Sequence, residues 1–319
     1  MKVLFVVPHY YRGMGDNTRY ASHSNRKKAQ RIQALDQLIF QIHSLYGNRH
    51  IKTINHDHEK AALRWAQSTT QNDFDIVVCT TGHDHLLYEI SCPGNFYHHL
   101  KLQSEPIWLG FAAQRFMLDQ KGRYDYYCYL EDDIILHDPG FFIKLRFFND
   151  TAPAHHLLLP QRYETPWIID GLKKQCYTKV YSDYAEYIKP EQALHYSFDF
   201  LGCPIDLVQP GLVHAGCYFL SAEQFEYVSG KPEFANYQDV PVDRALDAAA
   251  SLAIASHFLV FKPSGSNLDF FEVEHGVGNM FDQIALQPDG VISWNWSQEQ
   301  FDFSASTPQE LKQIGRAHV

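Results

Sequence analysis

The stretch that decides the fold is YDYYCYLEDDIIL, residues 124–136. Residues 124–130 form an aromatic and apolar run that predicts a buried strand, and Glu131, Asp132 and Asp133 follow directly after it. Ligands in open α/β sheets bind beyond the carboxyl ends of the strands, so we expect these acids to lie where ligand chemistry takes place. Because side chains alternate along an extended chain, Glu131 and Asp133 should point to the same side.

The triplet allows two interpretations. Adjacent carboxylates repel one another unless a cation lies among them, which predicts a site for Mg²⁺ or Mn²⁺ with oxygen ligands, bridged to a substrate diphosphate. The alternative is a solvated acidic turn in which Asp138 caps the next helix. On the triplet alone, both interpretations stay open.

The pattern on both sides of the triplet predicts alternating strands and helices. Toward the N-terminus we expect strands at 3–7, 50–54 and 74–80, with helices over 27–46, 59–68 and 107–120. Toward the C-terminus we expect a helix from 140 to 148, strands at 157–159, 212–220 and 258–261, and helices opening at 221 and covering 242–256. This order is typical of a mostly parallel sheet covered by helices.

Composition narrows the classes of function. The 319 residues contain 27 Lys+Arg against 37 Asp+Glu, a formal net charge of −10, which argues against a nucleic-acid partner. The six cysteines include no C-x-x-C pair, so we expect reduced thiols. The apolar runs are shorter than a signal peptide or a transmembrane segment requires, and we therefore expect a cytoplasmic chain without a membrane span.

The strand and triplet resemble the D-x-D motif of the GT-A glycosyltransferases, and three weaker elements follow in the order of that superfamily. These are HAGCYFLS at 214–221, QDVPVD at 238–243 and VEHG at 273–276. The resemblance implies a GT-A-like α/β fold with a mixed, mostly parallel sheet flanked by helices. It also implies a glycosyltransferase that uses Mn²⁺ or Mg²⁺ to transfer a sugar from a nucleotide-diphosphate donor to a carbohydrate or other hydroxyl acceptor, in glycan or polysaccharide synthesis.

The resemblance also implies roles for individual residues. Asp133 and His275 would bind the metal, with Glu131 as a further ligand or a ribose contact. Asp239 would accept the acceptor proton in an inverting reaction, or Asp243 one turn later would do so, because Gln238 stands where the family pattern has an acid. The donor side would comprise the loops after the strands and their neighbours, namely Pro8, His9, Tyr10, Arg12, Thr80, Thr81, Arg115, Asp132, His214, Ala215 and Gly216.

The domain prediction follows from the extent of the match. Residues 1–280 are expected to form a single catalytic domain with an aromatic-rich, acceptor-side insert at about 162–210. Residues 281–313 would be a C-terminal extension, and residues 314–319 resemble a translated sequencing adapter, which would make them an artefact.

Three other functions remain open on the sequence. A nucleotidyltransferase shares this kind of sheet and acidic site, although the glycine pattern at 12–15 lacks the usual lysine. A hydrolase with a histidine-bound metal is suggested by His-Asp-His at 56–58 and at 83–85. A non-catalytic protein that binds nucleotide sugars is favoured by Gln238.

Overall fold

The computed structural model describes residues 1–14, 21–47, 52–57, 60–65, 72–165, 179–181, 193–211, 213–277, 284–286 and 292–294. The chain divides into two compact units. The first comprises residues 1–163 and 181–277, and the second comprises residues 164–180 and 278–319. Within the second unit, β16 (Ile284–Leu286) and β17 (Ile292–Trp294) form an antiparallel pair.

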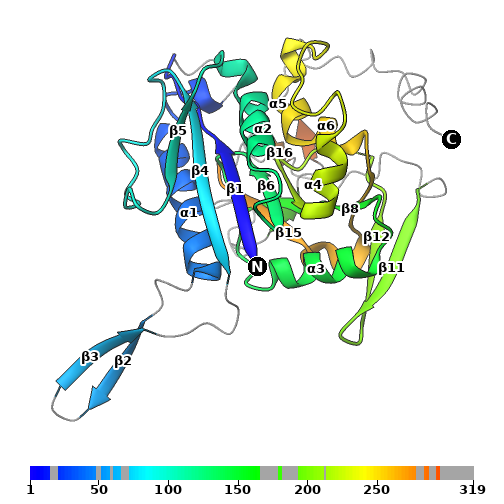
Figure 1. Cartoon of the computed structure of the whole chain (residues 1–319), viewed down its shortest axis with the longest axis horizontal. Helices are drawn as coiled ribbons and strands as arrows, with labels where there is room; N and C mark the ends of the chain where they lie inside the picture. The colour runs from blue at the N-terminus through cyan, green and yellow to red at the C-terminus, as the bar shows by residue number, and fades with distance from the viewer. Residues whose placement is uncertain are drawn as a thin grey trace. The chain divides into compact units, whose positions relative to one another are not determined.

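A five-stranded sheet lies at the centre of the first unit (Figure 1). Its order is β13-β6-β1-β4-β5, from β13 (Cys217–Ser221), β6 (Tyr126–Leu130), β1 (Lys2–Pro8), β4 (Asp73–Thr81) and β5 (His98–Leu102). The last four strands are parallel, and β13 runs antiparallel to β6 at the edge. The carboxyl ends of β1, β4 and β6 therefore meet at one edge of the sheet.

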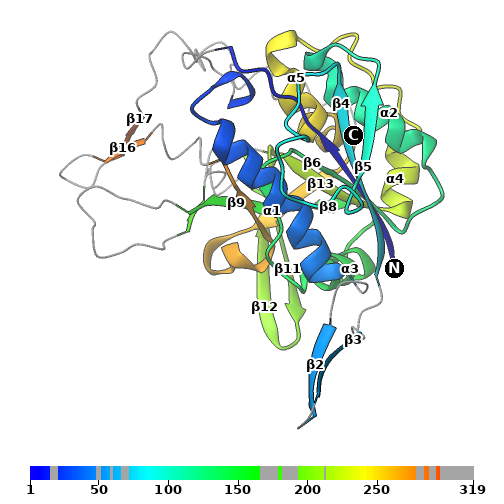
Figure 2. The same ribbon diagram turned by 90° about the vertical axis from the view of Figure 1, so that its left-hand side faces the viewer.

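Both faces of this sheet are covered by helices. Figures 1 and 2 show α1 (Lys28–Tyr46) on one face and α2 (Leu109–Asp119) with α4 (Ala222–Ser229) on the other. The alternation of β1 explains this, because Val3, Phe5 and Val7 pack with the α1 side while Leu4 and Val6 pack with the α2 side. Each fully buried Leu, Ile or Val of these faces contributes about 1.5–3 kcal/mol.

Helix boundaries follow local sequence signals. Gly47 follows the last residue of α1, and its N–H donates to the carbonyl of His43. Ser221 begins α4 with a capping box, in which the Ser221 hydroxyl accepts from the Gln224 N–H and the Gln224 side chain accepts from the Ser221 N–H. Helix α3 (Phe141–Thr151) begins after Gly140 and buries four large side chains on the α1 side.

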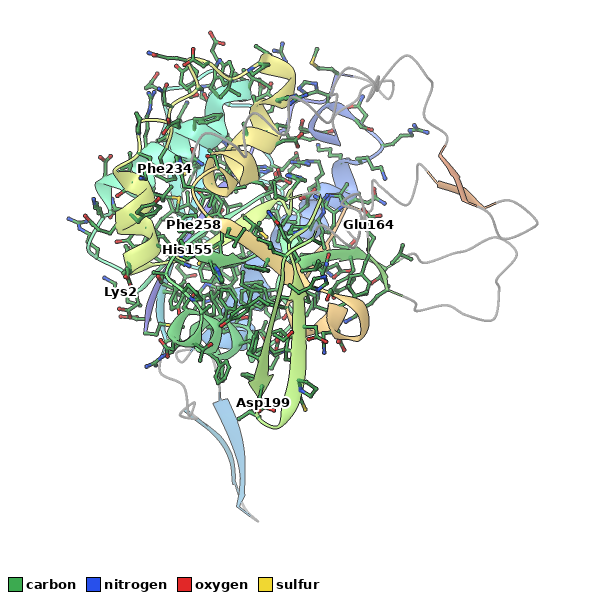
Figure 3. All side chains as sticks on the ribbon, turned by 90° about the vertical axis from the view of Figure 1, so that its right-hand side faces the viewer. Lys2, His155, Glu164, Asp199, Phe234 and Phe258 are labelled. Carbon is green, nitrogen blue, oxygen red and sulfur yellow. The ribbon has the colours of Figure 1, made fainter. Side chains whose placement is uncertain are left out.

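Two smaller sheets complete the first unit. One has the order β10-β9-β15-β7, from β10 (Val180–Tyr181), β9 (Gln161–Glu164), β15 (Glu272–His275) and β7 (Ile134–Ile135). The other has the order β11-β12-β14-β8, from β11 (His195–Phe200), β12 (Cys203–Val208), β14 (Leu259–Pro263) and β8 (His156–Leu158). Strands β11 and β12 form a hairpin, and Asp199 lies near its free end (Figure 3).

The remaining elements are short. Residues 242–255 form one continuous helical segment made of η4 (Val242–Arg244), α5 (Ala245–Asp247), the π-helical η5 (Ala248–Leu252) and α6 (Ala253–Ala255). The 3-10 helices η1 (Ala21–His23) and η6 (Gly265–Phe270) stand apart from longer helices, whereas η2 (Pro106–Trp108) leads directly into α2. Strands β2 (Lys52–Asp57) and β3 (Lys60–Trp65) pair as an antiparallel hairpin between α1 and β4.

The structure confirms the predicted fold class, a mixed and mostly parallel α/β sheet flanked by helices. The helix predicted over 59–68 is wrong, because Lys60–Trp65 is a strand that pairs along its whole length with β2. The strand predicted from 212 begins only at Cys217, and His275 lies at the end of a strand instead of in a loop. The predicted domain boundaries stay predictions, and residues 166–178, 182–192 and 295–319 lie outside the described residues.

Two further expectations concern the whole chain. Five cysteines, Cys79, Cys92, Cys128, Cys203 and Cys217, are free thiols, and Cys176 lies outside the described residues. In the part of the chain that the structure describes, no helix combines the length and the apolar character needed to cross a membrane.

Candidate functional site

The acidic triplet begins where β6 ends, at the edge that also carries the carboxyl ends of β1 and β4. The Glu131 N–H donates to the carbonyl of Gly216 (2.8 Å), so the turn is attached to the loop before β13. Strand β7 starts directly after the triplet, and its register places His275 opposite Ile134. The three acids are therefore held between the central sheet and the β9-β15-β7 sheet.

Asp133 faces His275. The Asp133 Oδ2 and His275 Nε2 atoms are 3.3 Å apart, and each side chain is only 8% exposed. The Gly276 N–H donates to the carbonyl of Asp133 (2.7 Å), which fixes the two strands at this point. Burial alone would raise the pKa of Asp133, but His275 and the guanidinium groups of Arg31 and Arg162 lower it below its usual range. Asp133 is therefore a buried, ionised carboxylate.

Glu131 points to Gly216 in the loop before β13. Gly216 has a φ of +64°, which favours glycine, and a Cβ atom there would lie 2.7 Å from Glu131 Oε2, so another residue would have to displace this carboxylate. Burial and the charge of Asp133 raise the pKa of Glu131 to about 8, against the opposing effect of Arg162 and His275. The surroundings thus shift the pKa values of Glu131 and Asp133 in opposite directions.

Asp132 has its own partners. Its Oδ2 atom accepts from Arg31 Nη2 (2.5 Å) on α1 and from His9 Nδ1 at the end of β1. The His9 Nε2 atom accepts from the Leu86 N–H (2.9 Å), so the proton of this histidine is on Nδ1. Asp132, predicted as a donor-binding residue, therefore joins β1, α1 and β6 through buried charge-assisted hydrogen bonds.

Two arginines that sequence reasoning missed balance the charge of this site. Arg31 on α1 and Arg162 on β9 are both buried, and both lower the pKa of Asp133. The only early signal was a basic residue on the buried face of α1, because Arg162 lies in the stretch that we treated as an insert. The acids are thus compensated by the protein's own cations, and their adjacency does not by itself require a metal ion.

The loop before β13 is held from several elements at once. The carbonyl of His214 accepts from Lys262 Nζ (2.8 Å) on β14, and the Ala215 N–H donates to Ser251 Oγ (3.3 Å). Lys262 and Ser251 are fully buried, and Ser251 belongs to the π-helical turn. Since π-helical turns are frequent at functional sites, this stretch is consistent with a loop that is positioned for ligand contact.

The His214 ring connects this loop with the helical segment 242–255. Its Nε2 atom accepts from Arg162 Nη1 (3.4 Å), so Nδ1 carries the proton. This Nδ1 atom lies 3.2 Å from Ser251 Oγ and 3.8 Å from Asp247 Oδ1. The charge of Asp247 also raises the pKa of Glu131, which places Asp247 close enough to the acidic site to act on it.

The acids predicted as proton acceptors stand in different surroundings. Asp239 is exposed in the turn before η4, and Asp243 belongs to η4, where its side chain lies outside the described residues. Asp247 lies four residues after Asp243, so sequence periodicity could have found it as the next acid on that side of the helix.

The predicted nucleoside-side residues lie at the carboxyl ends of β1 and β4. Pro8 ends β1, and the His9 N–H donates to the carbonyl of Cys79 (2.8 Å). Thr80 Oγ1 is 2.7 Å from His99 Nε2, and the Thr81 hydroxyl donates to the carbonyl of Ser104. Tyr10 follows this edge, and the Arg12 Nε atom lies 3.9 Å from Asp84 in an exposed pair.

Arg115 is placed differently. It donates from Nε to the carbonyl of Ala235 (3.2 Å), and its guanidinium lies 5.3 Å from the Tyr237 ring centroid. The structure therefore gives Arg115 a packing role between α2 and the segment before η4.

The residues around Asp133 meet one requirement of a divalent-cation site but not a second. The Asp133 Oδ1 atom is buried without a hydrogen-bond partner, which is costly for a carboxylate unless a cation or a ligand satisfies it. However, among the residues that the structure describes, no three His, Cys, Asp or Glu side chains lie together as a metal centre. This holds also for the described part of the two His-Asp-His stretches, so the hydrolase alternative gains no support there.

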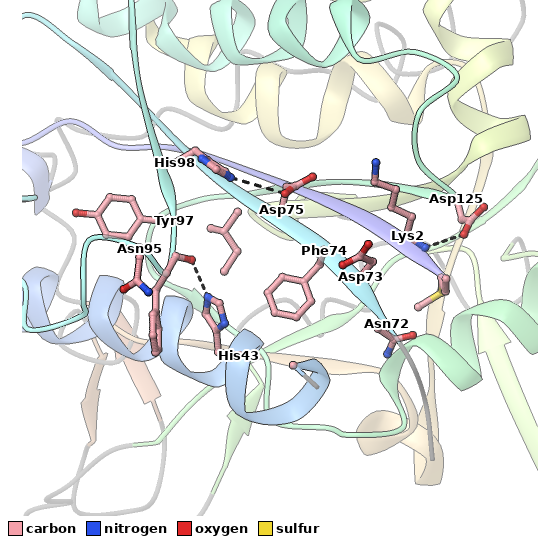
Figure 4. A pocket seen from close by; sticks show the side chains of 14 residues that line it. Lys2, His43, Asn72, Asp73, Phe74, Asp75, Asn95, Tyr97, His98 and Asp125 are labelled. Atoms are coloured by element: carbon pink, nitrogen blue, oxygen red, sulfur yellow. Dashed lines mark hydrogen bonds and ion pairs between the residues drawn. The ribbon is translucent and has the colours of Figure 1, made fainter. Parts of the chain in front are cut away.

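A pocket of about 900 Å³ lies elsewhere, at the amino ends of β1 and β4 (Figure 4). The acids that line it have structural partners: Asp125 accepts from the Lys2 N–H (2.7 Å), and Asp75 pairs with His98 at 3.7 Å. Tyr124 also donates to Asp75 (2.6 Å). Because ligands of such sheets bind at the carboxyl ends of the strands, we do not assign the candidate site to this pocket.

Comparison with known proteins adds little to this geometry. Among solved structures, the chain is similar to S. aureus TarS, a glycosyltransferase, at 11% sequence identity and a TM-score of 0.37. The match covers 85% of this chain and 38% of TarS, so the chain spans well under half the length of that protein. A likeness of this size carries no argument about activity. No protein-family profile and no curated protein matches the sequence.

Proposed function

We propose that the chain is a glycosyltransferase that transfers a sugar from a nucleotide-diphosphate donor to an acceptor hydroxyl. The observation that carries the proposal is the buried Asp133 carboxylate at the carboxyl end of β6, ionised and with its Oδ1 atom unsatisfied. The resemblance of residues 124–136, 214–221, 238–243 and 273–276 to the GT-A pattern supports it. The first and second of these stretches meet through the pairing of β6 with β13, and the fourth meets the first through the pairing of β7 with β15.

In this proposal Asp133 and His275 hold a divalent cation, Mn²⁺ or Mg²⁺, with Glu131 beside them. Such a cation supplies Lewis-acid stabilisation of the departing diphosphate. Arg31 and Arg162, whose charges act on Asp133, would add fixed positive charge where the leaving group becomes more negative. The loop at 214–216, held by Ser251 and Lys262, would lie beside the sugar.

The transfer itself breaks one bond and forms another. The acceptor oxygen bonds to the anomeric carbon, and the bond from this carbon to the diphosphate oxygen breaks, with the electron pair leaving on the diphosphate. The hydroxyl proton passes to a carboxylate of the segment 239–247. We propose Asp247 for this role beside the predicted Asp239 and Asp243, because its charge acts on Glu131 and it lies next to His214.

Donor turnover tests the proposal. A panel of nucleotide sugars is incubated with Mn²⁺, and release of the nucleoside diphosphate is measured for the parent, Asp133→Asn and Asp150→Asn. Asp150 is the matched control, because it is an exposed acid on α3 paired with Arg146 at the surface. We expect Asp133→Asn to lose about 3 kcal/mol of transition-state stabilisation, which lowers the rate of release roughly 100-fold. Asp150→Asn should keep the rate of the parent. Equal rates in all three proteins would refute the site.

Asn variants of Asp239, Asp243 and Asp247 show in the same assay which of these acids accepts the proton. Asp247→Asn should lower kcat by about 10²- to 10⁴-fold with little change in donor KM. If Asp239→Asn shows that loss and Asp247→Asn does not, the proton acceptor is the residue predicted from the sequence.

A further inference from the structure

A buried glutamine on α2 contacts two elements that border the loop before β13. Gln114 is fully buried, and its Nε2 atom donates to the carbonyl of Ala249 in η5 (2.9 Å) and to the hydroxyl of Tyr218 on β13 (3.3 Å). Among the described residues, no donor reaches its buried Oε1 atom. An unsatisfied buried oxygen costs free energy, so the contribution of this side chain lies in its amide donor.

The Ala249 carbonyl needs a donor from outside its helix because η5 is π-helical. The Ala253 N–H donates to the carbonyl of Ala248, five residues earlier, whereas an α-helix would use the carbonyl of Ala249. Ala249 is 1% exposed, so bulk water does not reach the carbonyl that the π register releases. Gln114 supplies a donor there, and its hydrogen bond therefore favours the π register over the α register.

A second residue of α2 brings η5 close at the same place. Gly110 lies four residues before Gln114, and a Cβ atom there would lie 2.7 Å from the Cβ atom of Ala249 and 2.6 Å from the Tyr129 hydroxyl. The lack of a side chain at Gly110 thus lets the backbone of α2 approach η5 directly. Because Gly110 and Gln114 share one side of α2, both contacts with Ala249 come from the same helix face.

The register of η5 sets the position of Ser251. This side chain is buried, and its hydroxyl accepts from the Ala215 N–H (3.3 Å). Each residue turns the chain by about 100° around a helix axis, so a change of one residue in the hydrogen-bond register would rotate Ser251 away from the Ala215 amide. Ala215 precedes Gly216, which Glu131 approaches, and the register of η5 therefore affects the loop at the acidic site.

We propose that Gln114 is a positioning residue for the proposed transfer. It holds the Ala249 carbonyl in the π register, which directs Ser251 to the Ala215 amide and so fixes the loop at 214–216. The inference rests on the proposed function, because it is there that this loop lies beside the sugar. A core glutamine without this role would contribute stability alone, whereas the contacts of Gln114 predict a local change in the loop when its donor is removed.

Amide hydrogen exchange tests the coupling without any substrate. Exchange is followed by NMR under native conditions for the parent, Gln114→Met and Gln224→Met, because methionine has the shape of glutamine without its donor. Gln224 is the control, since it is a buried glutamine whose Nε2 atom also donates to a backbone carbonyl, that of His156, beyond the far end of β13. We expect the Ala215 amide to exchange about tenfold faster in Gln114→Met and within about twofold of the parent rate in Gln224→Met.

Kinetics separate positioning from stability. With the nucleotide sugar that the parent uses, Gln114→Met should lower kcat about 10- to 100-fold, because the sugar is misaligned. The Kd of the nucleoside diphosphate with Mn²⁺ should change less than about threefold, and Gln224→Met should keep both values of the parent. If Gln114→Met does not fold, Gly110→Ala replaces it, because the new Cβ atom displaces η5 and leaves every polar side chain in place.

The outcomes distinguish this inference from the proposed function. Faster exchange at Ala215 in Gln114→Met supports the coupling even if the parent turns over no nucleotide sugar, in which case the proposed function alone fails. Equal exchange at Ala215 in the parent and in Gln114→Met overturns the inference. An unchanged kcat, or an equal loss in kcat and in diphosphate binding, overturns it as well.

Discussion

Replacing Gly216 with alanine tests the position of Glu131 directly. The backbone at Gly216 has a φ of +64°, where a non-glycine residue costs about 1–2 kcal/mol. Alanine also restricts the unfolded chain, which offsets about 0.4–1 kcal/mol of that cost. The new Cβ atom would lie 2.7 Å from Glu131 Oε2 and 3.1 Å from Ile134 Cδ1, a contact that adds about 1–3 kcal/mol of overpacking.

Gly122 provides the matched control. Its φ is +78°, and an added Cβ atom meets nothing within 4 Å, so Gly122→Ala carries the backbone cost alone. The free energy of unfolding is measured by urea denaturation followed by circular dichroism for both variants. Gly216→Ala should be less stable than Gly122→Ala by about 1–3 kcal/mol, which is the contribution of the contact with Glu131.

A double-mutant cycle identifies the neighbour that causes this cost. In a Glu131→Ala background the carboxylate is gone, so the extra cost of Gly216→Ala should shrink to less than about 1 kcal/mol. If Gly216→Ala costs no more than Gly122→Ala, or if Glu131→Ala leaves its cost unchanged, Glu131 does not lie against the loop and the geometry of the site is wrong.

Three further variants probe the network around the triplet. Ser251→Ala leaves a buried loop amide without its acceptor and should cost about 1–3 kcal/mol in urea denaturation, whereas the exposed control Ser256→Ala should cost less than about 0.5 kcal/mol. Asp132→Asn breaks the buried pair with Arg31 and should lower the free energy of unfolding by about 3–5 kcal/mol; a loss under about 1 kcal/mol would contradict the pairing. Burial raises the pKa of Glu131 from 4.5 to about 8, so the folded state holds this proton more tightly than the unfolded chain. The resulting stability is complete below pH 4.5 and is lost as the pH rises to about 8, and the stability of Glu131→Gln should lack this fall in a metal-free pH series.

The strands and helices with a strong apolar pattern were predictable from the sequence. Strand β1 and helix α1 match their predictions closely, because a strand buried on both faces gives a continuous apolar run and a helix buried on one face gives a helical period. The stretch 59–68 contains Ala, Leu and Glu, which favour helices, and it was predicted as a helix. Its pairing with β2 overrides this weak preference, since tertiary and hairpin contacts routinely outweigh intrinsic propensity.

The sequence predicted where the site lies but not all the side chains that contact its acids. The position of the acids after β6 follows from the strand pattern. The resemblance named His275 as a partner of Asp133, but it did not name Arg31 and Arg162, because these reach the triplet from α1 and β9, far apart in the chain. Adjacent acids in a sequence suggested one shared cation, whereas the structure gives each acid its own surroundings.

Manganese binding at Asp133 tests the central claim most directly. Free and bound Mn²⁺ are separated by electron paramagnetic resonance, with UDP, GDP and ADP each added in turn, for the parent, Asp133→Asn and Asp150→Asn. The account predicts that one nucleoside diphosphate promotes tight Mn²⁺ binding in the parent and in Asp150→Asn, and that Asp133→Asn loses this binding while remaining folded. Binding by Asp133→Asn as tight as that of the parent would contradict it.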